Sequence, residues 1–150
     1  NYRKLSGSQY FDRLGVGGLL KKRGRELSKG QRRRIHVAAG LLYAPRVFVL
    51  DEPFDGLDLE QAAVLTDILE EESSKMSIIV SSHRIDVIER LADTILVLRR
   101  GGVFSSGSTR EVCKALAGDF MESLSLTEAV NYHLLQASGA ADIGQLRFSK

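Results

Sequence analysis

Two acidic side chains, Asp51 and Glu52, directly follow the four apolar residues 47–50, and their types and position suit metal and water chemistry. An unbroken apolar run of this kind is typical of a buried parallel strand, and open α/β sheets place their chemistry at the carboxyl ends of strands. At such a position Asp51 could hold a magnesium ion through water, while Glu52 could orient or deprotonate an attacking water. The pair by itself is a weak signal, because many strands end in an acid that only improves solubility.

A histidine, His83, follows a second apolar strand-like run, residues 77–80, and two serines. A histidine in this position is more often a helix cap or a surface residue than a catalyst. His83 therefore becomes a candidate catalytic residue only if a wider pattern supports it.

Residues 27–31 have the sequence LSKGQ and stand at the start of a predicted helix. Ser28 followed three residues later by Gln31 is an ordinary capping box. However, Gly30 in the first turn costs about 1 kcal/mol in helix propensity relative to alanine. A helix start without a Cβ in the way is also a place where a phosphate can meet free backbone N–H groups. A helix cap and a phosphate site therefore both stay open.

The elements that would position these residues alternate between helix and strand. The predicted helix after Ser28 has an apolar stripe, and so does a helix that begins at Asp58, which Gln61 can help to cap. The two stripes consist of Ile35, Ala38, Ala39 and Leu42, and of Ala62, Leu65 and Leu69. Further along, the pattern predicts a helix over 85–91, a strand over 94–98, a hairpin turn at Gly101-Gly102 and helices beyond Thr109, before a small and polar tail from Ser138. This alternation predicts an α/β fold with a parallel sheet.

The motifs gain specificity from their order, because LSKGQ, VFVLDEP, FDGLD and SSHR follow one another with one helix or less between them. The series resembles the ATP-binding cassette (ABC) transporter ATPases over residues 10–109. The resemblance implies that residues 27–31 are the signature loop, which contacts the γ-phosphate of an ATP held by the opposite subunit of a dimer. It thus implies an ATP-binding role for Ser28, Lys29, Gly30 and Gln31.

The same resemblance implies roles for the acids and the histidine. Asp51 matches the magnesium-binding Walker B aspartate, and Glu52 matches the catalytic carboxylate that follows it. His83 matches the switch histidine that reaches the γ-phosphate. Residues 55–58 match the D-loop, which runs across the dimer interface. The resemblance therefore implies that Asp58 lines this interface and the ATP site as well as capping its helix.

Several departures from the family pattern bear on the fold. No glycine is followed by lysine, so the Walker A pattern GxxxxGK[ST] is absent, and Lys29 replaces the usual second glycine of the signature. The resemblance implies an incomplete P-loop NTPase (RecA-like) parallel sheet with flanking helices, which lacks the P-loop strand between 77–80 and 94–98. Residues 1–109 would form the C-terminal part of a nucleotide-binding domain, with 1–45 ending its helical subdomain and carrying the signature helix. Residues 110–150 would be a C-terminal helical extension and tail.

Composition limits the remaining classes of protein. Hydrophobic residues make up 43% and charged residues 27% of the 150, as in soluble globular proteins, and no apolar run approaches the ~20 residues of a membrane span. The single cysteine, Cys113, excludes an internal disulfide and a cysteine zinc cluster.

Positive charge is concentrated at the start of the sequence, where residues 1–34 hold 11 Lys and Arg against two acids. Such a segment indicates an anionic partner (phosphate, nucleic acid or lipid headgroups) or merely a solvated basic face.

These expectations combine into an ABC transporter ATPase subunit that uses ATP and Mg²⁺. The resemblance implies a second nucleotide-binding domain as its dimer partner, a transmembrane permease, and a missing N-terminal Walker A half without which the chain would be inactive. It also implies a cytoplasmic protein bound peripherally to the inner face of the membrane through the permease. A soluble ABC protein acting on ribosomes or nucleic acid, and a truncated non-catalytic module, are the alternatives. Because the sequence shows no long coiled-coil or linker insertion, nucleic acid is not the expected partner.

Overall fold

The computed structural model describes residues 8–118 and 124–137. The chain divides between Arg84 and Ile85 into two compact units, each of which is described by itself below. The predicted polar tail from Ser138 lies outside the described residues, and the predicted domain boundary at residue 109 stays a prediction. Among the helices that are described, none combines the length and the apolar character needed to cross a membrane.

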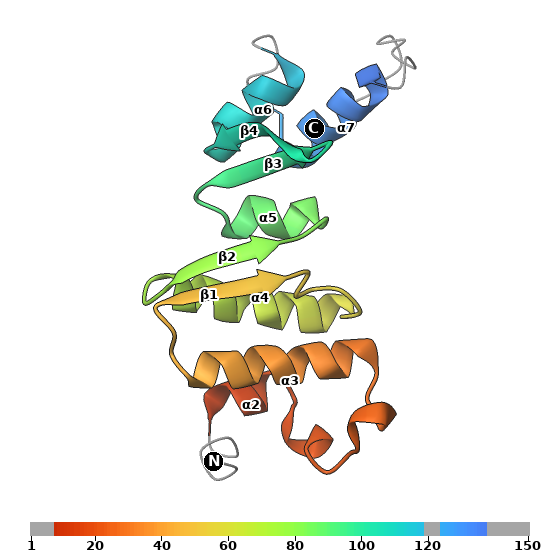
Figure 1. The fold of residues 1–150 in the computed structure, drawn as a ribbon, viewed down its shortest axis with the longest axis vertical. Helices are drawn as coiled ribbons and strands as arrows, with labels where there is room; N and C mark the ends of the chain where they lie inside the picture. The colour runs from red at the N-terminus through yellow and green to blue at the C-terminus, as the bar shows by residue number, and fades with distance from the viewer. Residues whose placement is uncertain (1–7, 119–123, 138–150) are drawn as a thin grey trace. The chain divides into compact units, whose positions relative to one another are not determined.

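The first unit contains a parallel pair of strands with helices on one side (Figure 1). Its elements in chain order are α2 (Gln9–Arg13), two short 3₁₀ helices (Gly17–Leu19 and Gly24–Glu26), α3 (Lys29–Leu42), β1 (Val47–Asp51), α4 (Leu59–Ser73) and β2 (Ser77–Ser81). Strands β1 and β2 pair in parallel register, with Asp51 opposite Ser81. Figure 1 shows α4 running along this strand pair, with α3 and α2 beyond it.

The two strands are less buried than the sequence predicts. Leu50 is 8% exposed, but Val47 and Val49 of β1 are 53% and 66% exposed, and Ile79 of β2 is 57% exposed. These three side chains share one face of the pair, because successive residues of a strand point to opposite sides and Val49 is the register partner of Ile79. The prediction of a fully buried β1 is therefore wrong for this face, which no described element of this unit covers.

The predicted inner stripe of α3 is also partly wrong. The buried apolar residues are Val37, Ala38 and Leu41, whereas Ile35 and Leu42 are only half-buried. The buried face is set by the neighbours of α3, which include α2, so the helix is rotated relative to the orientation that its periodicity suggests. For α4 the prediction is confirmed, since the buried face includes Ala62, Leu65 and Leu69.

The second unit is a hairpin packed with helices. Its elements are α5 (Ile85–Leu91), β3 (Ile95–Arg99), β4 (Gly102–Gly107), α6 (Thr109–Ala117) and α7 (Leu126–Ala137). Strands β3 and β4 are antiparallel, and the turn between them places Arg100 and Gly101 at φ of 50° and 77°. The core of the unit is formed by Ile95, Val112, Cys113, Leu116, Leu126 and Ala129. The predicted hairpin and the helices beyond Thr109 are thereby confirmed.

Together these elements confirm an α/β fold with a small parallel sheet and flanking helices. The absence of a strand of the family sheet between residues 77–80 and 94–98 stays a prediction.

Candidate functional site

The candidate site begins where β1 and β2 end, because parallel strands bring their carboxyl ends to the same edge. The hydroxyl of Ser81 donates a hydrogen bond to Asp51 Oδ1 at 2.5 Å. The backbone N–H of Glu52 donates to Ser81 Oγ and to the Ser81 carbonyl, both at 3.0 Å. Ser81 therefore holds both the carboxylate of Asp51 and the backbone N–H of Glu52 in place.

Glu52 turns the chain sharply out of the strand. Its φ is 46°, in the left-handed region that residues other than glycine rarely adopt. Its carbonyl accepts a hydrogen bond from the N–H of Asp55 at 3.2 Å, which closes the turn. Strain of this kind persists only where surrounding contacts over-determine the conformation, and the bonds to Ser81 and Asp55 supply such contacts.

The turn aims the carboxylate of Glu52 at the histidine that follows the neighbouring strand, β2. Glu52 Oε2 lies 3.0 Å from Nδ1 of His83. The His83 side chain is 73% exposed and that of Glu52 is 32% exposed, so solvent or a ligand can reach the pair. When the hydrogen bond uses Nδ1, the other ring nitrogen, Nε2, stays available for a second partner.

The oxygen donors at this edge fit a magnesium ion that is shared with a ligand. Magnesium keeps several waters and is bound in nucleotide enzymes by one or two carboxylates together with substrate phosphates. Asp51 offers a carboxylate held in place by Ser81, and Glu52 lies beside it. Over the part of the chain that the structure describes, no group of three or more His, Cys, Asp or Glu side chains could enclose a metal ion. A magnesium ion at Asp51 and Glu52 would therefore need further oxygen ligands from water or from a bound molecule.

The start of α3 is capped as the sequence predicts. Ser28 Oγ accepts a hydrogen bond from the Gln31 N–H at 3.2 Å, and Gln31 Oε1 accepts one from the Ser28 N–H at 3.1 Å. The capping box is confirmed, which means that Ser28 and Gln31 bind each other here. A contact of either residue with phosphate stays a prediction.

The first turn of α3 is joined to the turn that follows Glu52. The ammonium of Lys29 forms an ion pair with Asp55 Oδ2. Beside it, a Cβ added at Gly30 would lie only 2.2 Å from the carbonyl oxygen of Gly56, a separation that real Cβ atoms essentially never show. Gly56 has a φ of 78°, which favours glycine. The two backbones can approach this closely only because Gly30 carries no side chain.

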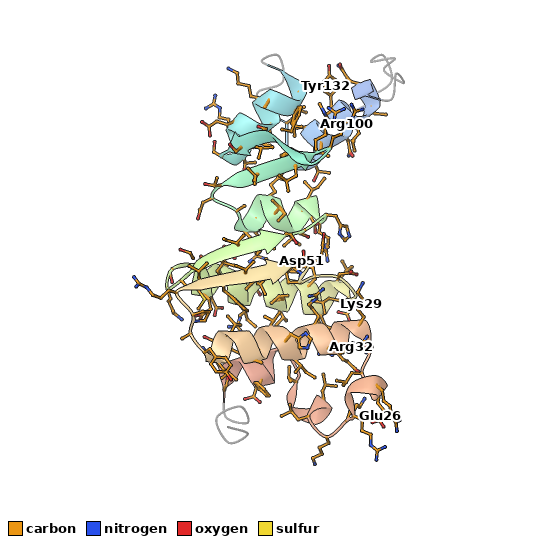
Figure 2. All side chains as sticks on the ribbon, viewed as in Figure 1. Glu26, Lys29, Arg32, Asp51, Arg100 and Tyr132 are labelled. Carbon is orange, nitrogen blue, oxygen red and sulfur yellow. The ribbon has the colours of Figure 1, made fainter. Side chains whose placement is uncertain are left out.

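Electrostatics at this junction are governed by the lysine. The hydrogen bond from Lys29 is the largest cause that lowers the pKa of Asp55 below its usual value, and the charges of Lys29, His83 and Arg33 act in the same direction. Asp55 is therefore ionised at neutral pH. Figure 2 shows Lys29 at the start of α3 and Asp51 at the end of β1, and Figure 1 shows both ends on the same side of this unit.

Asp58 begins the next helix. Its Oδ1 accepts a hydrogen bond from the Gln61 N–H at 2.8 Å, and its Oδ2 accepts one from Gln61 Nε2 at 2.7 Å. The predicted cap of α4 is confirmed. The predicted place of Asp58 in a dimer interface stays a prediction.

The basic segment before α3 is partly structural. Arg32 donates a hydrogen bond to the Leu27 carbonyl, and Arg34 donates one to the Leu14 carbonyl, each at 2.8 Å. These two guanidinium groups therefore brace the approach to α3. The four cations at positions 21–25, which precede α3, are solvent-exposed and are Lys21, Lys22, Arg23 and Arg25.

The structure thus assembles the predicted residues into two neighbouring groups. Asp51, Glu52 and His83 meet at the end of the strand pair, while Lys29 and Gly30 meet the turn at 55–56. Sequence reasoning missed the part played by Ser81, and it treated Asp55 only as one residue of the D-loop. A hydroxyl residue at the end of a strand adjacent to the Asp51 strand was the available signal for Ser81, but using it requires the register of β1 and β2.

Comparison with known proteins identifies the family. The model of the ABC transporter family matches residues 6–55. The energy-coupling factor transporter ATP-binding protein EcfA2 of Streptococcus sanguinis is 42% identical over 102 residues, which are 67% of this chain and 36% of that protein. The molybdenum import ATP-binding protein ModC of Albidiferax ferrireducens is 32% identical over 156 residues, covering 90% of this chain and 42% of that protein. The chain thus spans about two fifths of the length of these relatives.

A solved structure agrees with the sequence comparison at the level of the fold. The structure of an ATP-binding subunit of an ABC transporter superposes with a TM-score of 0.74 at 20% identity, over 89% of this chain and 56% of that one. At this identity the likeness establishes the fold alone. Taken with the matching family model and the related ATP-binding proteins, it shows that the chain belongs to the ABC transporter ATPase family.

Proposed function

We propose that this chain supplies the signature-loop and Walker B side of an ATP-hydrolysing site that works in a dimer of nucleotide-binding domains and energises transport through a membrane permease. The observation that carries the proposal is the 3.0 Å contact of Glu52 with His83, beside an Asp51 carboxylate oriented by Ser81. This arrangement places a candidate base, a candidate phosphate contact and a candidate metal ligand at one edge of a parallel sheet.

In the proposed mechanism each side chain has one task. Asp51 would hold a magnesium ion through water, and such an ion would supply positive charge that offsets the charge of the phosphates. Glu52 orients or deprotonates the attacking water, and His83 keeps the Glu52 carboxylate in place through Nδ1. If the ring carries protons on both nitrogens, Nε2 can donate to the γ-phosphate at the same time.

The other half of the proposal concerns the start of α3. Ser28, Lys29, Gly30 and Gln31 would face the γ-phosphate of an ATP bound mainly by the opposite domain. The first-turn N–H groups of a helix are partly free and carry the positive end of its dipole, which favours an anion. Asp58 would line the same interface.

A Walker A segment must come from outside these 150 residues, since no Gly-Lys pair occurs in them. We therefore expect the isolated chain to show only weak, millimolar-type binding in isothermal titration with Mg-ATP, and no ATPase activity. A micromolar dissociation constant for the isolated chain would contradict this part of the proposal.

The decisive experiment uses a complete cassette, in which this chain is joined to a Walker A segment. Glu52→Gln removes the carboxylate that positions water, but it keeps the shape of the side chain and leaves Asp51 unchanged. ATP should therefore bind without being hydrolysed. We expect gel filtration with ATP to show a trapped dimer and the ATPase rate to fall by roughly a hundredfold or more, as for loss of a general base. A variant that stays monomeric with ATP and retains near wild-type turnover would refute the assignment.

A further inference from the structure

The Lys29–Asp55 pair stands out because it links the start of α3 to the turn after Glu52, and the proposed function gives Asp55 no task. The side chains are 62% and 36% exposed, so the ammonium is accessible to an incoming ligand. Lys29 is the first residue of the 14-residue helix α3, while Asp55 follows Glu52 by three residues. The ammonium is therefore bound to a carboxylate of its own chain at the place where the proposed function puts a nucleotide phosphate.

A triphosphate and Asp55 would compete for this ammonium. The nucleotide carries several negative charges, and a carboxylate close to them would repel them wherever the two share one cation. An ammonium has three N–H donors and could bind both the phosphate and Asp55, but the repulsion between these two anions would remain. The Asp55 charge therefore opposes the arrival of phosphate at Lys29, whether or not the ion pair opens fully.

The neighbouring glycine contact does not depend on charge. Gly30 and Gly56 are in backbone contact, so the two turns stay together even when the ion pair loosens. The Asp55 N–H also donates to the Glu52 carbonyl at 3.2 Å. A change in the partner of Lys29 is thereby connected, through Asp55, to the residue that carries the proposed catalytic carboxylate.

We propose that Asp55 is a built-in competitor that holds the ammonium of Lys29 until the γ-phosphate of a nucleoside triphosphate displaces or neutralises the contact. The inference rests on the proposed function, because it assumes that a triphosphate reaches the start of α3. Asp55 is then a positioning residue that lowers the affinity for ATP. When phosphate binds at Lys29, the contacts of Asp55 change, and with them the contacts of the turn after Glu52.

The test measures the ATP concentration for half-maximal dimerisation of the complete cassette, with Glu52→Gln present throughout so that ATP is not consumed. Asp55→Asn keeps the shape of the side chain and frees Lys29, so we expect the half-maximal concentration to fall about two- to five-fold, the range of exposed ion pairs. Lys29→Met should raise it by at least the same factor. In the double variant the gain from Asp55→Asn should shrink, because no ammonium is left to free and only the direct repulsion of the phosphate is removed.

Glu60→Gln is the matched control, since it removes the same charge from an exposed position in the first turn of α4 and should leave the half-maximal concentration unchanged.

If the ion pair only stabilises the structure, Asp55→Asn and Lys29→Met should both weaken dimerisation. That result would overturn the inference while the proposed function stands. Equal and additive effects in the double variant would also overturn it. If the parent cassette fails to dimerise with ATP at all, the proposed function falls and the inference falls with it. Melting temperatures confirm folding, and Asp55→Ser replaces Asp55→Asn if the latter is unfolded.

Discussion

Replacing Gly30 with alanine tests the backbone contact between α3 and the turn after Glu52. In an ordinary helix this change would gain up to about 1 kcal/mol from helix propensity. Here the new Cβ would lie 2.2 Å from the Gly56 carbonyl oxygen, so one backbone must move by roughly 1 Å to reach an ordinary contact distance. Forced shifts of this kind in packed regions cost about 1 to 3 kcal/mol. Even with the full gain from helix propensity, we therefore expect a net loss of up to about 2 kcal/mol in the free energy of unfolding.

Thermal unfolding followed by circular dichroism measures the effect. For a unit of this size, a loss of 1 kcal/mol lowers the melting temperature by at least about 4 °C. Gly18→Ala is the matched control, because a Cβ at Gly18 meets nothing within 4 Å and its φ is not positive. The control should leave the melting temperature unchanged or slightly raised.

The sign of the change decides the matter. If Gly30→Ala raises the melting temperature while Gly18→Ala behaves as expected, the close approach of Gly30 and Gly56 does not exist in solution. In that case the coupling of the start of α3 to the turn at residues 55–56 loses its structural basis. A fall in both variants would instead indicate a general intolerance of the unit to added methyl groups.

Three further outcomes follow from the structure. Ser81→Ala in a complete cassette removes the hydroxyl that binds Asp51 and the Glu52 N–H, but keeps the bond from this N–H to the carbonyl of residue 81. We expect the ATPase rate to fall about tenfold or more with little loss of melting temperature. An unchanged rate would show that the Ser81 hydroxyl does not orient these groups. Ser28→Asp preserves a good helix cap, so the melting temperature without nucleotide should stay nearly constant. If Ser28 faces a phosphate, the same change should abolish ATP-driven dimerisation. Retained dimerisation would show that Ser28 is a helix cap only. Finally, the guanidinium of Arg13, at 2.6 and 2.9 Å from the two carboxylate oxygens, holds the pKa of Glu71 below its usual 4.5. A depressed pKa gives stability that is present above the unfolded value and lost as pH falls, so the melting temperature should drop below about pH 4.5, and Arg13→Met should flatten this drop; an identical slope in the variant would contradict the assignment.

The order of the elements and their caps could be predicted from the sequence because they depend on residues close together in the chain. The capping box of Ser28 with Gln31 and the cap of Asp58 with Gln61 each span three residues. The strand runs and the buried face of α4 follow from short periodic patterns. The motif order was enough to indicate the family, which the comparisons then showed.

The contacts that make the candidate site were decided by tertiary structure alone. Ser81 reaches Asp51 across 30 residues, and Lys29 reaches Asp55 across 26. Whether such pairs meet depends on the register of β1 with β2 and on how α3 packs, and a one-residue shift of a strand would turn each side chain to the other face. For the same reason periodicity misjudged the buried face of α3 and the exposure of Val49, because burial is a property of the neighbours that a segment meets rather than of its own pattern.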